Sequence, residues 1–218
     1  MSEDVPFESG RRLMIELQLR RRGIQDERVL EAMFRVPRHE FVPSAYVNAA
    51  YEDRPLPIGE SETISQPYIV AVMTQASRVE AGDRALENGA GAGYQAAVLA
   101  YLGAKVNTVE RNTKLAQAAR ERLKRLGYEN VEVITGDGSE GYAPAAPYQV
   151  ILVTAAAPRV PETLLDQLAE AGRLVIPVGD LHHQTLFVIT RRGNEFSQEA
   201  LDPCQFVPLI GKHGWPES

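Results

Sequence analysis

Residues 83–95, with the sequence DRALENGAGAGYQ, constrain the fold more than any other part of this chain. They predict a short buried strand, a turn with glycine at alternate positions, and a helix that begins near Tyr94. Alternate glycines let the backbone turn sharply and let a ligand approach the peptide groups closely. The N-terminus of the helix offers free N–H groups and the positive end of a dipole, which favour a carboxylate or a phosphate. The segment therefore predicts a strand–turn–helix unit that binds a small ligand.

Acidic residues lie at or just after the ends of three predicted strands. Glu87 ends the strand before the glycine turn, Glu110 ends the strand at 105–109, and Asp137 follows the strand at 131–134. An acid roughly 20 residues after a glycine turn is where nucleotide-binding βαβ units hold ribose hydroxyls. The spacing Gly-x-Gly-x-Gly differs from the Gly-x-Gly-x-x-Gly of dinucleotide-binding folds, which disfavours a dehydrogenase. The pattern predicts a cofactor that contains adenosine.

The rest of the chain continues the alternation of strands and helices. Further strands are predicted at 148–154, 172–179, 185–191 and 206–209, with a helix at 162–169. The segment 148–154 is apolar on both faces, which is typical of a central strand in a parallel sheet. The pattern predicts an α/β fold, with a doubly wound, mostly parallel seven-stranded sheet. It does not give the order of the last two strands.

The N-terminal part has a different pattern. Residues 1–60 are predicted to form a helical extension packed on a core of residues 61–218. Within it, helices are expected at 8–22 and 27–34. Apolar residues at helical spacing predict the inner face of the first helix, formed by Leu13, Met14 and Leu17.

Composition limits the functional classes. The net charge of −6 argues against a dedicated nucleic-acid binder, which needs a basic surface. The single cysteine, Cys204, favours a reducing compartment, and the four histidines lack the spacing of zinc ligands. No signal peptide and no apolar run of roughly 20 residues is present. We expect a cytoplasmic monomer that binds no metal, membrane or nucleic acid.

A loop rich in proline and glycine spans residues 51–68 and precedes a predicted helix. Loops of this kind often carry functional residues. Two interpretations of this loop remain open at this point. Thr63 or Ser65 could do no more than cap the helix, or Ser65 could act in a binding site.

Several segments resemble one known family, the protein-L-isoaspartate O-methyltransferases of the bacterial type. The resemblance runs from about residue 10 to residue 215. Its segments are LPIG at 56–59, TISQPY at 63–68, VTAAAP at 153–158, GRLVIPVG at 172–179 and FVPLIG at 206–211. The glycine turn is shared by most methyltransferases that use S-adenosyl-L-methionine, whereas TISQP and VTAAAP are specific to this family.

The resemblance implies a Rossmann-like fold and an enzyme of protein repair. Such an enzyme moves a methyl group from S-adenosyl-L-methionine to the α-carboxylate of L-isoaspartyl residues in damaged proteins and peptides, and leaves S-adenosyl-L-homocysteine. Ser65 matches the family's active-site serine. Glu87 and the glycines would hold the methionine part, Glu110 the ribose, and Asp137 with Gly138 the adenine. The cofactor-binding residues expected in this way are Thr63, Ile64, Glu87, Asn88, Gly89, Ala90, Gly91, Gly93, Glu110, Asp137 and Gly138.

The implied chemistry needs few catalytic groups. A sulfonium is already a good leaving group and a carboxylate is already ionised at neutral pH, so no general base is required. Alignment of oxygen, carbon and sulfur supplies most of the catalysis. Ser65 would then orient the carboxylate by hydrogen bonding.

This sequence departs from the family pattern at several positions. Asn88 stands where an aliphatic residue is usual, Ala90 and Ala92 replace small hydroxyl residues, and Gln149 replaces an aspartate. Residues 60–62 are ESE where HGQ is usual. An unpaired buried amide costs about 1–3 kcal/mol, so Asn88 is expected to weaken the site most. Two alternatives therefore stay open: a methyltransferase with another acceptor, and a catalytically weakened relative that binds peptides.

Overall fold

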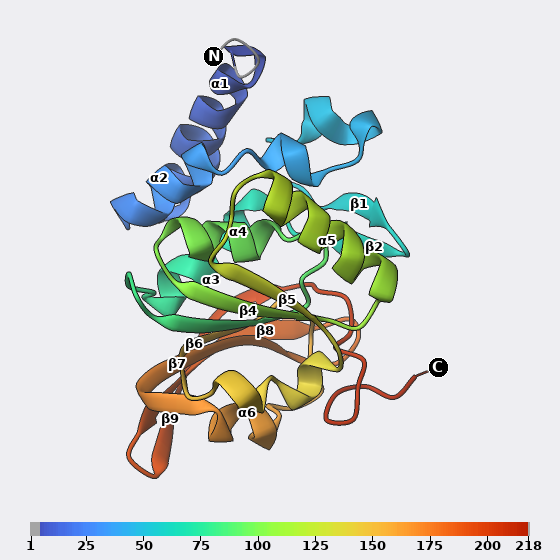
Figure 1. Ribbon diagram of the computed structural model, residues 1–218. Coiled ribbons are helices and arrows are strands. Elements are labelled where there is room, and N and C mark those ends of the chain that lie inside the picture. Colours follow the sequence, from blue (N-terminus) through green and yellow to red (C-terminus); the bar gives the residue numbers. More distant parts are fainter. Residues whose placement is uncertain (1–4, 218) are drawn as a thin grey trace.

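The computed structural model describes residues 5–217 and contains one seven-stranded sheet (Figure 1). The order of its strands is β5-β4-β3-β6-β7-β8-β9. Strands β3 to β7 pair in parallel, and β8 and β9 pair antiparallel at one edge. The strands are β3 Arg84–Asn88, β4 Lys105–Glu110, β5 Val131–Thr135, β6 Tyr148–Val153, β7 Leu168–Gly179, β8 Gln184–Arg192 and β9 Glu195–Cys204. The predicted fold class is confirmed.

Helices cover both faces of this sheet (Figure 1). Helices α3 Pro67–Ser77, α4 Tyr94–Tyr101 and α5 Thr113–Arg125 lie on one face, and the short α6 Glu162–Asp166 lies on the other. Alternate residues of the central strand β6 serve the two faces. Val150 and Leu152 pack in the cluster under α3 and α4, whereas Ile151 and Val153 pack in the cluster that contains Leu164 of α6. This two-sided burial explains why the segment is apolar throughout.

Two predicted elements at the C-terminal side are wrong. Residues 206–209 form no ladder strand, and Pro208 makes only an isolated bridge to Ala156. The seventh strand is β9, which a turn brings back beside β8. Its side chains are mostly exposed, so the sequence EFSQEALDPC lacks the alternation of a half-buried strand. The predicted helix at 162–169 also ends early, because β7 already begins at Leu168.

The N-terminal part is helical, but the predicted inner face of its first helix is partly wrong. The part comprises α1 Val5–Leu13, the π-helical η1 Met14–Leu19, the 3₁₀ turn η2 Arg20–Arg22, α2 Glu27–Arg35, and the 3₁₀ turns η3 Arg38–Phe41 and η4 Ser44–Ala49. Met14 is buried as expected, whereas Leu13 is 56% and Leu17 is 45% exposed. A π-helical turn bonds residue i to i+5 and so rotates the side chains away from the regular α-helical positions. Ile15 and Leu19 take the inner positions instead.

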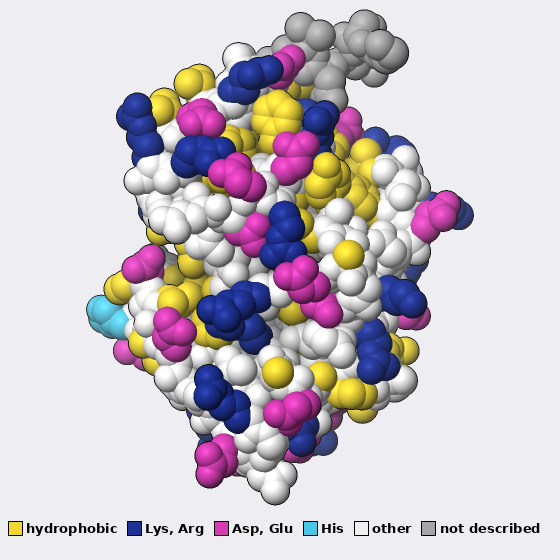
Figure 2. All heavy atoms as spheres, turned by 90° about the vertical axis from the view of Figure 1, so that its left-hand side faces the viewer, with side chains coloured by type: hydrophobic (Ala, Val, Ile, Leu, Met, Phe, Trp, Pro, Cys, Tyr) yellow, Lys and Arg dark blue, Asp and Glu magenta, His cyan; other side chains and the backbone are white. Residues whose placement is uncertain are grey.

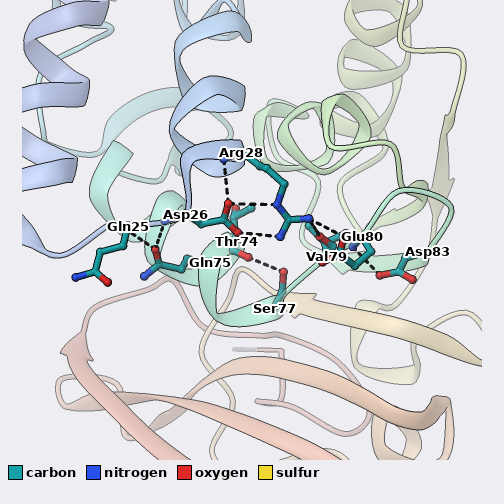
Figure 3. A network of polar contacts seen from close by, with 9 residues as sticks. All are labelled: Gln25, Asp26, Arg28, Thr74, Gln75, Ser77, Val79, Glu80 and Asp83. Atoms are coloured by element: carbon teal, nitrogen blue, oxygen red, sulfur yellow. Dashed lines mark hydrogen bonds and ion pairs between the residues drawn. The ribbon is translucent and has the colours of Figure 1, made fainter.

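A polar network fastens the N-terminal part to the core at the end of α3 (Figure 3). Gln75 Oε1 accepts hydrogen bonds from the backbone N–H groups of Gln25 and Asp26, at 2.7 and 3.0 Å. The Asp26 carboxylate also caps α2 by accepting the N–H of Arg28. The guanidinium of Arg28 donates to Asp26 at 2.9 Å and to Glu80 at 2.7 Å, and so links the two acids. The start of α2 is therefore held directly on the C-terminal turn of α3.

A two-stranded hairpin, β1 Leu56–Gly59 and β2 Glu62–Ile64, follows the helical part. Glu60 and Ser61 in its tip have positive φ angles of 52° and 61°. Glu60 pairs with Lys114 at the start of α5, at 3.1 Å, and this contact fixes the tip near the ends of the sheet strands. The division of the chain at residue 60 stays a prediction, and the hairpin has one strand on each side of it. No helix of the described part is long and apolar enough to cross a membrane.

Candidate functional site

A cleft, partly open to solvent, lies at the C-terminal ends of β3, β4 and β6. Open α/β sheets bind ligands at this edge. The predicted residues that line the cleft are Thr63, Ile64, Ser65, Glu87, Gly89, Ala90, Gly91, Glu110 and Gly138. The structure thus brings together most of the residues selected from the sequence.

The glycine turn forms one wall of the cleft. Gly89 and Gly91 have φ angles of 102° and 50°, which side-chain-bearing residues rarely adopt. A Cβ atom at Gly89 would lie 2.5 Å from Thr154 Oγ1, whose hydroxyl donates to the Gly89 carbonyl at 2.7 Å. The positive φ and the close Thr154 hydroxyl, directly after β6, together favour glycine at this position.

Glu110 closes the turn from the neighbouring strand. Its Oε2 accepts the N–H of Gly91 at 2.9 Å, and its Oε1 accepts the N–H of Asn112 at 2.9 Å. Each oxygen of a carboxylate can accept a second hydrogen bond. Glu110 is thus held in one orientation and still has acceptor capacity toward ligand hydroxyls, as the sequence predicts for a ribose-binding acid.

Glu87 lies deeper in the cleft and is 1% exposed. Its Oε2 accepts a hydrogen bond from Thr108 Oγ1, whereas its buried Oε1 has no hydrogen-bond partner among the described residues. Burial raises the pKa of Glu87 to about 8, and the nearby charge of Glu110 adds to this shift. A cationic group in the cleft would satisfy the free oxygen and favour the ionised carboxylate.

Gln95 is a lining residue that the sequence analysis did not select. It is 5% exposed, and its Nε2 donates to Thr74 Oγ1 at 2.9 Å. Its buried Oε1 has no partner among the described residues, so a second acceptor is available in the same cleft. The sequence feature that could have identified Gln95 as a lining residue is its position in the first turn of α4, just after the glycine turn.

Three of the predicted cofactor residues do not line the cleft. The Asn88 side chain points to the other face of β3. Both of its amide atoms are buried there without hydrogen-bond partners among the described residues, as expected for an amide at this strand end. Gly93 is the N-cap residue of α4, and a Cβ atom at this position would lie 3.1 Å from the Leu123 side chain. Asp137 accepts from Ser139 N at 2.8 Å and from Lys212 N at 2.8 Å, and so orders the turn that carries Gly138.

Ser65 stands opposite the glycine turn and lines the cleft. The N-cap of α3 is Gln66, with no side-chain capping bond, so neither Thr63 nor Ser65 serves as the cap. The Ser65 carbonyl accepts a hydrogen bond from Arg38 Nη2 at 2.7 Å. The capping interpretation is therefore excluded, and Ser65 is a lining residue of the cleft.

Comparisons with known proteins agree with this geometry. The family model described as Protein-L-isoaspartate(D-aspartate) O-methyltransferase (PCMT) matches residues 9–214. A protein-L-isoaspartate O-methyltransferase of Methanoregula boonei is 54% identical over 215 residues, which cover 99% of each chain. One of Koribacter versatilis is 54% identical over 209 residues, which cover 96% of this chain and 94% of that one.

Solved structures lead to the same family. A protein-L-isoaspartate O-methyltransferase superposes with a TM-score of 0.85 at 31% identity, over 94% of this chain and 67% of that one. A Plasmodium falciparum chain solved in complex with S-adenosyl-L-homocysteine superposes with a TM-score of 0.79 at 29% identity, over 90% of this chain and 96% of that one. From the matched family model, the close relatives and the shared fold, we conclude that the chain belongs to the protein-L-isoaspartate(D-aspartate) O-methyltransferase family.

Proposed function

We propose that this protein methylates the α-carboxylate of L-isoaspartyl residues in damaged proteins and peptides, with S-adenosyl-L-methionine as the methyl donor. One observation carries the proposal. Ser65 and the glycine turn, which are far apart in the sequence, line the same cleft. A protein whose relatives carry this name needs both a cofactor cradle and an acceptor site. The cleft offers both at one sheet edge.

The residues of the cradle fit the cofactor. The free acceptors Glu87 Oε1 and Gln95 Oε1 suit the ammonium of its methionine part, and Gly89 and Gly91 line the cleft without a side chain. Glu110 is oriented for the ribose hydroxyls, and Gly138 lies at the adenine end. When bound, S-adenosyl-L-methionine supplies a methyl group on a sulfonium that is already a good leaving group.

Ser65 is assigned to the acceptor. Its hydroxyl can donate to one oxygen of the carboxylate and leave the other free to attack, which fixes the direction of attack without any proton transfer. The Arg38 hydrogen bond to its carbonyl restrains the position of the residue. Orientation of this kind is the main contribution that the chain must make, because neither reacting group needs activation.

Partners and location follow the same proposal. We assign isoaspartyl peptides and proteins as the acceptors, a monomeric state, a cytoplasmic location, and no nucleic-acid or membrane partner. The net charge of −6 supports this assignment, and Lys, Arg, Asp and Glu side chains are interspersed on the face shown in Figure 2. Burial raises the pKa of the Cys204 thiol to about 11, which fits an unreactive thiol in a reducing compartment.

A second candidate acceptor has one observation in its favour. Glu62 lines the cleft beside Glu110, and burial raises the pKa of the Glu62 carboxyl above its usual range. Where this carboxyl is ionised, its negative charge disfavours an anionic acceptor. A methyltransferase with a different acceptor would explain such a residue.

Methyl transfer from labelled S-adenosyl-L-methionine to two peptides tests the proposal. The peptides differ only in one aspartyl or isoaspartyl linkage. Labelling of the isoaspartyl peptide alone is expected. If neither peptide is labelled but calorimetry still shows binding of S-adenosyl-L-homocysteine, the protein has another acceptor. If cofactor binding is lost as well, the protein is a catalytically inactive relative.

A further inference from the structure

Arg38 is a fully buried arginine directly behind the proposed acceptor site. Its side chain is 0% exposed, and it comes from η3 in the N-terminal part. Nε donates to the Ala50 carbonyl at 2.8 Å, and Nη2 donates to the Ser65 carbonyl at 2.7 Å. The centre of the guanidinium lies 4.8 Å from the centroid of the Tyr94 ring, and Tyr94 itself lines the cleft.

No carboxylate of the described residues forms an ion pair with this guanidinium. Asp53, an acid whose charge acts on it, is already engaged by the Tyr68 N–H at 2.9 Å and by the Arg22 guanidinium. Burial lowers the pKa of Arg38, yet an arginine stays protonated in a protein. A buried charge without an ionic partner is costly and uncommon, so it calls for a role.

The charges of the cleft supply a reason for such a role. Glu62, Glu87 and Glu110 line it, and Arg111, the one arginine among its described lining residues, is paired with Glu217. Where these carboxyl groups are ionised, they favour a cationic cofactor and repel an anionic acceptor. The acceptor carboxylate therefore needs a positive charge on the Ser65 side.

We propose that Arg38 is a positioning residue that supplies this charge: it holds the Ser65 backbone and makes the potential at Ser65 favourable for the acceptor carboxylate. The two tasks use the same guanidinium. Its hydrogen bonds to two carbonyls fix it in place, and the absence of a bound carboxylate leaves its charge uncompensated toward the cleft. The guanidinium is fully buried and bonded directly to the Ser65 carbonyl, so its field there is weakly screened.

This inference rests on the proposed function, and the test separates the two. Wild-type protein is first assayed for methyl transfer to an isoaspartyl peptide, and a failure there counts against the function alone. Peptide dissociation constants are then measured by calorimetry, with S-adenosyl-L-homocysteine present. One peptide has the isoaspartyl α-carboxylate and the other has a neutral α-carboxamide at the same position.

Arg38→Met removes the charge and keeps the length of the side chain. We expect it to weaken the carboxylate peptide about tenfold or more, and the carboxamide peptide by less than about threefold. Affinity for S-adenosyl-L-homocysteine should stay within about twofold of wild type. Equal weakening of both peptides would overturn the proposal, because a purely structural role predicts it. The control is Arg120→Met, which removes another arginine that donates to a backbone carbonyl, that of Val133 at 2.9 Å.

Arg38→Lys tests the proposal even where the methionine variant fails to fold. A buried lysine has a lowered pKa, so its charge can be titrated near neutral pH. We expect the lysine variant to keep the preference for the carboxylate at low pH and to lose it as the pH rises from about 7 to about 9.5, while wild type keeps it throughout. A preference with the same pH dependence in variant and wild type would overturn the role of the charge.

Discussion

Thr108 donates its hydroxyl to Glu87 across the ladder between β4 and β3, with 2.5 Å between Thr108 Oγ1 and Glu87 Oε2. Both side chains are buried, and burial raises the pKa of Glu87 to about 8 against the opposing effect of this hydrogen bond. The carboxyl is thus largely protonated at neutral pH in the absence of a cation. Its ionisation is coupled to folding and to the occupant of the cleft.

The stability of the protein should depend on the ionisation of Glu87. The unfolded chain releases this proton near pH 4.5 and the folded chain near 8, so the unfolded state binds fewer protons between these values. Stability from this group is therefore present at low pH and is lost as the pH rises through that window. Urea unfolding of wild type and Glu87→Gln at pH 5 and pH 8 measures it. We expect the glutamine variant to gain stability relative to wild type at pH 8, and a difference that does not change with pH would contradict the assignment.

Cofactor binding should release a proton. The ammonium of the methionine part favours the ionised Glu87 carboxylate, so the pKa of Glu87 falls on binding. Calorimetric titration of S-adenosyl-L-homocysteine at pH 7 in two buffers of different ionisation enthalpy should give different apparent enthalpies. Glu87→Gln should remove the difference. Identical enthalpies in both buffers for wild type would show that the group does not change its protonation state.

Asn88→Ile should stabilise the protein. Asn88 is 0% exposed, and its two amide atoms lack partners among the described residues. Removal of two unpaired buried groups should raise the free energy of unfolding by about 1–3 kcal/mol and steady the adjacent glycine turn, with tighter cofactor binding as a result. The control is Asn107→Ile, which removes an amide that already donates to Glu132 at 2.8 Å and should give no gain. A lower or unchanged melting temperature in the Asn88 variant would mean that the neighbouring Gly138 leaves too little room for isoleucine.

Sequence patterns predicted this site well where local geometry decides the residue. The backbone at Gly89 favours glycine, and an acid at the end of β4 must lie beside the glycine turn because parallel strands end at one edge. Both features can be read from the sequence, because the positive φ of Gly89 and the strand–helix–strand unit that carries the acid both lie within residues 84–110.

The features that the sequence did not predict depend on contacts between distant residues. β9 is an edge strand with exposed polar side chains, so its place is set by the turn before it and by pairing with β8, which no periodicity records. The π-helical turn buries Ile15 and Leu19 and leaves Leu17 exposed, which α-helical spacing does not predict. Arg38 meets Ser65 only after folding, 27 residues away in the chain, and its sequence neighbours gave no reason to bury a charge. Tertiary contacts decide these features.

Gly89→Ala should abolish cofactor binding. The variant places a Cβ atom 2.5 Å from Thr154 Oγ1 at a φ of 102°, so the turn or the Thr154 side chain must shift, which disturbs the hydrogen bonds from Thr154 to the carbonyls of Asn88 and Gly89. Binding of S-adenosyl-L-homocysteine should weaken by about 100-fold or more, because the turn forms the cradle itself.

The matched control is Gly193→Ala, in the turn between β8 and β9. Gly193 also has a positive φ, of 61°, and no atom within 4 Å of the added Cβ, so the same backbone strain arises without a clash. Comparable losses of affinity in the two variants would mean that general destabilisation, and not the shape of the cradle, governs cofactor binding.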